Sequence, residues 1–312
     1  MKKSLILIVF VVFNCNFVFA GAGATSGGVL LEPLGARSVG LGGACSSLTE
    51  DVTFLHYNPA SLVGLKVSEI SVLYYNSGTT GMNYGSITYG QPIGFGNAGI
   101  SVAYLNGGEM ELNFIDGSTT NVISEQDVRG TISIGIPFGE KLGLGASAKV
   151  LYSSLVNSRS ASGIAADVGA IYKGLILDEV NVGASVVNIG TGLKYLDTVE
   201  SLPINIQGGV SYNFNIIEDI KLLVAVDGVY SLNDKVLMIR SGIEGNYGDI
   251  SVRIGVPFSS VDDQSWTVGV GYRLNEFGFD YGASFGKVLG LTHRISIGMK
   301  LGEEEIGKHR KK

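Results

Sequence analysis

Few residues in this 312-residue chain have the types and spacing that catalysis requires. Histidine, the most frequent general base, occurs only as His56, His293 and His309. His293 lies three residues before Ser296, and on a strand that spacing places the two side chains on opposite faces. They cannot form a nucleophile–base pair. No His-Glu-x-x-His or Cys-x-x-Cys sequence predicts a zinc site. We therefore expect no enzyme activity, no metal and no cofactor.

A glycine-rich stretch near the N-terminus is the next candidate, because such loops can cradle phosphates. It has the sequence Gly-Ala-Arg-Ser-Val-Gly-Leu-Gly-Gly-Ala at residues 35–44. No strand is expected before it, and no Lys-Ser/Thr pair follows it, as a phosphate-binding loop requires. The formal net charge of −6 and the pI near 5.2 also argue against nucleic acid as a partner, since nucleic-acid-binding domains usually carry a basic face.

The N-terminus has the order of a secretory signal peptide. Two lysines precede an apolar run from Leu5 to Phe19, and cleavage is expected after Ala20. The run is too short for a membrane-spanning helix, which needs about 20 apolar residues. The sequence therefore predicts export with residues 1–20 removed. The remaining chain keeps one cysteine, Cys45, which cannot form an internal disulfide.

Regular alternation of apolar and polar side chains begins at Val67. Between Ile204 and Phe214, for example, Ile206 and Val210 fall on one face and Gln207 falls on the other. A side-chain period of two is the geometry of a strand, and a length of about ten residues suits tilted barrel strands. We expect fourteen strands, at residues 67–75, 82–92, 97–106, 126–137, 142–153, 163–172, 180–188, 204–214, 220–230, 236–246, 249–256, 265–274, 277–286 and 292–301.

Connection lengths alternate almost throughout these strands, except that 173–179 is long for a turn and 231–235 and 287–291 are short for outer loops. Long connections are expected at 107–125, 154–162, 189–203 and 257–264, and tight ones at 93–96, 138–141, 215–219, 247–248 and 275–276. Short periplasmic turns and longer outer loops are typical of outer-membrane barrels. The alternative is a soluble two-sheet sandwich with one face in water, but a sandwich has no reason to place its long loops at one end.

Charged side chains fall on one face of the expected strands. An Arg or Lys at the mid-plane of a barrel's lipid face costs about 2–4 kcal/mol, so we assign the charged face to the barrel interior. The main residues expected to face the lumen are Arg129, Lys149, Asp167, Asp227, Arg240, Glu244, Arg273, Asp280 and Arg294. Tyrosines such as Tyr74 and Tyr152 fall near strand ends, where interfacial girdles occur.

The segment 21–66 does not alternate and carries two motifs. Gly-Ala-Arg-x-x-Gly-x-Gly-Gly-Ala at residues 35–44 is followed by Asn-Pro-Ala-x-Leu at residues 58–62. Together they resemble the N-terminal signature of the PorV/PorQ family, which is similar to the FadL group of outer-membrane transporters. The resemblance covers essentially the whole mature chain. It continues through residues 107–109, 162–169, 187–190, 279–281 and 292–296.

The resemblance implies an all-β fold, a transmembrane antiparallel β-barrel of about fourteen strands. The barrel would span residues 67–301, with residues 21–66 folded inside the lumen as a hatch and residues 302–312 forming a charged tail. Lumen-facing Arg and Asp residues are expected to pair with the hatch, because polar groups in a plugged lumen must be satisfied. The hatch residues singled out are Gly35, Ala36, Arg37, Gly40, Gly42, Gly43, Asp51, Asn58, Pro59 and Ala60.

Two functions follow from the resemblance. FadL relatives move hydrophobic molecules inward through a hatch and a lateral wall opening, so we expect passage of hydrophobic small molecules across the outer membrane. PorV relatives serve type IX secretion, so binding or escorting exported proteins at the cell surface is the alternative. A purely structural surface antigen is a third possibility. The expected location is the bacterial outer membrane, and the expected partners are its lipid together with hydrophobic molecules or exported proteins.

Overall fold

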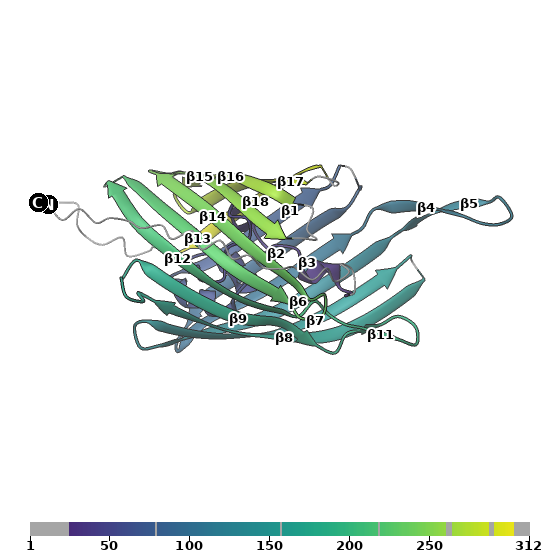
Figure 1. Cartoon of the computed structure of the whole chain (residues 1–312), viewed down its shortest axis with the longest axis horizontal. Coiled ribbons are helices and arrows are strands. Elements are labelled where there is room, and N and C mark those ends of the chain that lie inside the picture. Colours follow the sequence, from purple (N-terminus) through teal and green to yellow (C-terminus); the bar gives the residue numbers. More distant parts are fainter. Residues whose placement is uncertain are drawn as a thin grey trace, which may run out of the picture.

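The computed structural model describes residues 25–78, 80–156, 158–217, 219–259, 264–286 and 290–302. In these ranges, fourteen strands form one closed antiparallel barrel (Figure 1). The predicted all-β barrel is therefore confirmed. The predicted signal peptide, residues 1–20, and the tail after Gly302 lie outside the described residues.

The wall strands follow one another around the barrel in chain order. They are β1 (Ser68–Asn76), β2 (Asn83–Ile93), β3 (Gly96–Asn106), β6 (Glu125–Phe138), β7 (Leu142–Leu155), β8 (Arg159–Lys173), β9 (Val180–Gly190), β12 (Asn205–Ile217), β13 (Ile220–Ser231), β14 (Val236–Tyr247), β15 (Ile250–Ser259), β16 (Gln264–Leu274), β17 (Phe277–Gly286) and β18 (Leu291–Leu301). The barrel closes where β1 pairs with β18, from Ser68↔Leu301 to Asn76↔His293. Closure leaves no sheet edge, which is the condition for strands to cross a membrane.

The alternation in the sequence becomes an apolar outer surface and a polar interior. On β7, Val150 and Tyr152 point outward with 62% and 49% of their surface exposed, whereas Lys149 and Leu151 point inward and are buried. On β7 the charged side chain therefore faces inward, as the alternation predicts. No helix in the described ranges is both long and apolar enough to span a membrane.

Connections at one end of the barrel contain structure that the alternation did not predict. The expected loop 107–125 forms a ribbon of β4 (Glu109–Asn113) and β5 (Thr119–Ile123), which projects beyond the barrel rim (Figure 1). The expected loop 189–203 contains the short pair β10 (Leu193–Lys194) and β11 (Val199–Glu200). The long loop predicted at 154–162 was wrong, because β7 and β8 stay paired as far as Leu155↔Arg159. We call this end the loop end and the opposite one the turn end.

Residues 25–66, here called the interior segment, lie inside the barrel (purple in Figure 1). Their short helices are η1 (Gly28–Leu30), α1 (Ala36–Gly40), η2 (Val52–His56) and η3 (Pro59–Gly64). The side chain of Asp51 caps η2 by accepting a hydrogen bond from Thr53 N. Asn58 caps η3 in the same way through Ala60 N, and Pro59 occupies the first helical position. Helix α1 packs on β15 to β18, and η3 packs on β3 and β6 to β8.

Wall glycines let the interior segment approach the barrel backbone to backbone. A Cβ added to Gly145 would lie 2.2 Å from Ala60 N, and one added to Gly255 would lie 2.2 Å from Gly42 N. At glycines on β2, β3, β6 to β9 and β14 to β17, an added Cβ would lie 3.0 Å or less from a backbone or side-chain atom of the interior segment. They are Gly90, Gly99, Gly135, Gly143, Gly145, Gly169, Gly183, Gly242, Gly255, Gly269 and Gly282. The interior segment thereby forms a septum across the lumen.

Candidate functional site

A chain of ion pairs joins the septum to the wall on its turn-end side. Arg37 of α1 donates from Nε and from a terminal nitrogen to the two carboxylate oxygens of Glu244, both at 2.9 Å. A second carboxylate, that of Asp51, lies 3.6 Å from Arg37. Glu244 also accepts from Arg253, which reaches Asp280 at 2.7 Å. The charges alternate in sign, so each buried carboxylate is compensated by at least one guanidinium.

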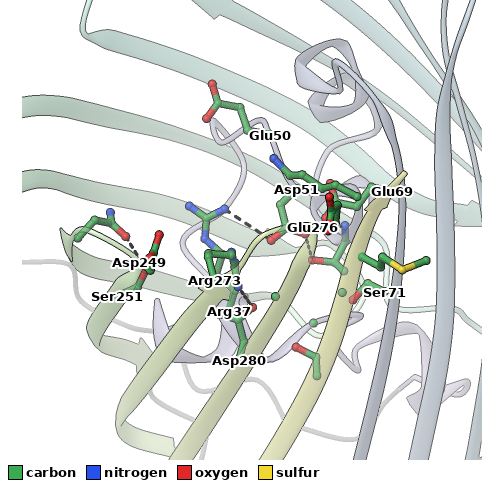
Figure 2. Close-up of a pocket in the computed structure, with 18 of the residues that line it drawn as sticks. Arg37, Glu50, Asp51, Glu69, Ser71, Asp249, Ser251, Arg273, Glu276 and Asp280 are labelled. Atoms are coloured by element: carbon green, nitrogen blue, oxygen red, sulfur yellow. Dashed lines mark hydrogen bonds and ion pairs between the residues drawn. The ribbon is translucent and has the colours of Figure 1, made fainter. Parts of the chain in front are cut away.

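Beyond this network lies a cavity of about 620 Å³, here called the turn-side cavity. Its walls come from the interior segment and from the turn-end parts of β1 and β13 to β18. Figure 2 shows Arg37 and Asp51 at this cavity together with Arg273 and Asp280, which form their own ion pair at 2.9 Å. Charged groups dominate the lining, so this cavity is suited to water and polar groups.

A second cavity, of about 440 Å³, lies on the loop-end side of the septum, and we call it the loop-side cavity. Apolar side chains line it from both the interior segment and the wall, namely Leu30, Leu31, Pro33, Val39, Val187, Val236, Met238 and Pro257. Polar side chains are interspersed, including His56, Tyr57, Gln207, Arg240 and Arg294. The two cavities share no lining residue. The septum separates the loop-side cavity, with its mixed apolar and polar lining, from the turn-side cavity, with its charged lining.

Two arginines face the loop-side cavity with different partners. The Arg294 guanidinium lies 4.4 Å from the ring centroid of Tyr75, donates to Ser284 Oγ at 2.6 Å and is 3.7 Å from Glu32. Arg240 packs its side chain over Gly43 of the septum. Within the described ranges no ion pair is formed by Arg240. Asp227 lies opposite Arg240 in the ladder between β13 and β14, and Glu32 and Asp234 also line the cavity.

The wall beside this cavity includes the ladder between β15 and β16. In the described part of the chain it runs from Ile250↔Tyr272 to Gly255↔Thr267. Strand β15 itself continues to Ser259 along its other neighbour, β14. Pro257, which lines the loop-side cavity, lies in this stretch and has no N–H to donate.

No protein-family model matches the chain, and no curated protein is similar to it in sequence. Solved structures do match. The Ralstonia pickettii toluene transporter TbuX superposes with a TM-score of 0.63 at 15% identity, over 87% of this chain and 99% of that one. The Pseudomonas putida toluene transporter TodX gives 0.61 at 15% identity, over 86% and 96%. The fold is that of FadL-type barrels.

A Pseudomonas aeruginosa FadL homologue agrees with this assignment, with a TM-score of 0.55 at 11% identity over 87% of this chain and 99% of that one. The sequence-based expectation of a FadL-type architecture is confirmed. Within this FadL-type barrel, the predicted lumen-facing residues lie on the inner face of the wall or at its turn-end rim. Their partners differ from site to site.

Some lumen residues bind the septum and others bind each other. The carboxylate of Asp227 accepts from Ser46 N at 2.8 Å. Lys149 pairs instead with Asp167 of the neighbouring wall strand, at 2.8 Å, and donates to Asn188 at 2.7 Å. Asn188 has φ +65° and lies where β9 bulges against β8, with its N–H donating to Asp167. This second cluster stabilises the wall, not the septum.

Two contacts of Arg129 with the septum were not predicted from the sequence. Arg129 donates at 2.7 Å to the carbonyl oxygen of Val29, a backbone acceptor that no side-chain pattern indicates. Arg129 also contacts His56, to which the sequence assigned no role. A histidine surrounded by Phe, Leu and Tyr in a non-alternating segment is the sequence signal that could have marked a buried ring. In the described ranges, no group of three or more His, Cys, Asp or Glu side chains is placed to hold a metal.

Proposed function

We propose that this protein is an outer-membrane channel for hydrophobic small molecules, with the interior segment as its hatch. The observation that supports this function is the loop-side cavity, a space of about 440 Å³ lined by apolar groups of both septum and wall. Small-molecule sites are typically concave and largely apolar, with a few polar groups that orient the ligand. Two of the matching structures are described as toluene transporters.

The proposed location, the outer membrane, follows from the structure of the barrel wall. The barrel turns its apolar side chains outward and leaves no open edge, which is the form that strands take in an outer membrane. Bacterial barrels place short turns in the periplasm, so we assign the turn end to the periplasm and the loop end to the outside. A ligand would therefore enter the loop-side cavity from outside.

The hatch residues have distinct roles in this proposal. Arg37 holds the septum to the wall above the turn-side cavity through Glu244, and Asp51 pairs with Arg37 within the septum. On the opposite side of the lumen, Asn58 donates to Ala170 O at 3.0 Å and to the septum's own backbone. We propose no catalytic role for any of these groups.

The cavity can be tested by filling it. Met238 lines the loop-side cavity, whereas its neighbour Ile239 points outward with 41% of its surface exposed. Met238→Trp should abolish uptake of radiolabelled toluene by lipopolysaccharide-bearing cells that produce the protein, because the indole occupies the cavity. Ile239→Trp, a matched change on the lipid face, should leave uptake unchanged. Wild-type uptake no greater than in cells without the protein, or undiminished uptake by Met238→Trp, would contradict the proposed function.

The ribbon of β4 and β5 favours a second candidate, the PorV/PorQ-type role of binding exported proteins. It exposes Phe114 and Ile115 at its tip, where Asp116 accepts hydrogen bonds from the N–H and hydroxyl of Ser118. Two strands alone are marginally stable in water, and a partner would stabilise them. A photo-crosslinker at Ile115 should capture an exported protein, whereas one at Leu232, in another outer loop, should not. Absence of adducts at both sites would contradict this role.

A further inference from the structure

Arg129 connects the barrel wall to two separate stretches of the interior segment. One terminal nitrogen donates to Val29 O at 2.7 Å and lies 3.4 Å from His56 Nδ1, and the other donates to Tyr84 OH at 3.3 Å. A guanidinium can only donate, so His56 Nδ1 must accept. The imidazole is therefore neutral and carries its proton on Nε2. A second proton on Nδ1 would set two N–H groups, on two cations, against each other.

The charged groups facing His56 make a second proton more unfavourable still. Cationic side chains act on it from three wall strands, Arg129 of β6, Lys149 of β7 and Arg240 of β14. The carboxylates on adjoining strands are engaged elsewhere, Asp127 with Val29 N and Asp167 with Lys149. From the interior segment, Tyr57 contributes only the edge of its ring, with centroids 4.9 Å apart. Burial, and then these cations, lower the pKa of His56 well below its usual value.

His56 also lies where acid from outside can reach it, since it lines the loop-side cavity. Residues 25–34 of the interior segment pack Val29, Leu30 and Leu34 in an apolar cluster with wall side chains. Their polar contacts with the barrel are few. Besides the Arg129 bond to Val29, Ser26 N donates to Ser201 O at 2.9 Å. The other hydrogen bonds and ion pairs with the neighbouring wall strands are long: 3.5 Å from Val29 N to Asp127, 3.5 Å from Tyr84 OH to Glu32 O, 3.4 Å from Ser86 Oγ to Leu34 O, and 3.7 Å between Glu32 and Arg294. The septum proper, from Ala36 onward, is held by the ion pairs and by close backbone packing.

We propose that His56 and Arg129 form an acid-sensitive latch, in which protonation of His56 displaces the Arg129 guanidinium and releases the stretch around Val29 from β6. Because Leu30, Leu31 and Pro33 of this stretch line the loop-side cavity, its release opens that cavity to the outside. The septum itself stays in place. The latch concerns the state of the cavity and goes beyond the proposed function, since it does not depend on which molecule the cavity takes.

Hydrogen–deuterium exchange of the purified full-length protein in detergent micelles tests the latch. Peptides covering residues 26–34 should exchange about tenfold faster at pH 5.5 than at pH 7.5 after correction for the intrinsic rate. The ordinary pKa of histidine is about 6.5, and one pH unit below it favours the protonated, released state by about a factor of ten. His56→Gln keeps an acceptor for Arg129 but cannot gain a proton, so its exchange should change less than twofold. His293→Gln, at the other described histidine, should respond like the wild type.

A further variant keeps the test decisive if His56→Gln does not fold. Arg240→Gln removes one cation that faces His56, so the midpoint of the acid response should move to higher pH. An acid response that persists in His56→Gln, an unchanged midpoint in Arg240→Gln, or no response in the wild type down to pH 4.5 would each overturn the latch. Failure of toluene uptake at neutral pH would contradict the proposed function and leave these exchange results unaffected.

Discussion

Arg37 and Glu244 are joined by two parallel hydrogen bonds, each 2.9 Å long, across 207 residues of sequence. The bidentate arrangement fixes the orientation of the guanidinium as well as its distance. Since Arg37 belongs to α1 and Glu244 to β14, the pair sets the position of the septum in the lumen. Glu244 has a second partner, Arg253.

Loss of this pair should loosen the septum. We expect Arg37→Gln to lower the free energy of unfolding by about 3 kcal/mol, because it leaves a buried carboxylate with one cation instead of two. Urea unfolding in lipid vesicles measures this, and a double-mutant cycle with Glu244→Gln isolates the coupling between the two side chains. A coupling energy below about 0.5 kcal/mol, the size of an exposed pair, would show that the contact does not hold the septum.

A second prediction concerns the close packing of the septum backbone against the wall. Gly145→Ala places a methyl group 2.2 Å from Ala60 N, where neither backbone can yield easily. We expect a loss of about 2–3 kcal/mol and faster proteolysis of the interior segment, as overpacking displaces η3. Gly85→Ala on β2 is the matched control, since its nearest neighbour, Leu73 O, is 3.7 Å away. Equal proteolysis of the two variants would contradict tight packing at Gly145.

The stability of the protein should depend on pH through His56. Its pKa in the folded state lies below the unfolded value of about 6.5, so the unfolded state binds more protons as pH falls through that window. The contribution of His56 to the free energy of unfolding is therefore fully present above about pH 6.5. It declines below that pH by at most about 1.4 kcal/mol per pH unit. The free energy of unfolding, measured between pH 5 and 8, should fall less steeply in His56→Gln than in the wild type. Identical slopes would contradict the assignment.

The wall could be predicted from sequence because its signal is local. A period of two placed Lys149 inside and Val150 outside from their positions alone, and closure of the barrel preserved that choice. The ribbon of β4 and β5 was missed, although it pairs Met110 with Val122, because its glycines and Asp116-Gly117 indicate a loop.

Partners across the lumen could not be predicted, because they depend on how far each strand is staggered around the barrel. The sequence indicated that Lys149 and Arg37 both face inward, but Lys149 binds its neighbour on the wall and Arg37 binds across to β14. Nothing in the local pattern distinguishes these two cases. The contact of Arg129 with Val29 O is still less visible, since the acceptor is backbone.

The pair within the wall is a further test. Lys149→Met should destabilise the barrel by about 3–5 kcal/mol, because Asp167 is left as an uncompensated buried charge. Adding Asp167→Asn should restore much of this loss, since the amide needs no counter-ion and can still accept from Asn188 N. Urea unfolding of both variants measures the recovery. If the double variant is no more stable than Lys149→Met, the lysine acts through its contact with Asn188 and not by neutralising Asp167.

A covalent link between β15 and β16 tests whether ligands leave the loop-side cavity through this part of the wall. Val256 and Trp266 are the first residues beyond the last described pair of the β15–β16 ladder, Gly255↔Thr267. Joining cysteines at these two positions with a short bis-maleimide should reduce toluene uptake if ligands leave the cavity between the strands. The same linker at Ile254 and Val268, which are already paired, is the control and should leave uptake unchanged. Cys45 is buried and should not react. Undiminished uptake after complete linkage at 256 and 266 would place the exit elsewhere in the wall or through the septum.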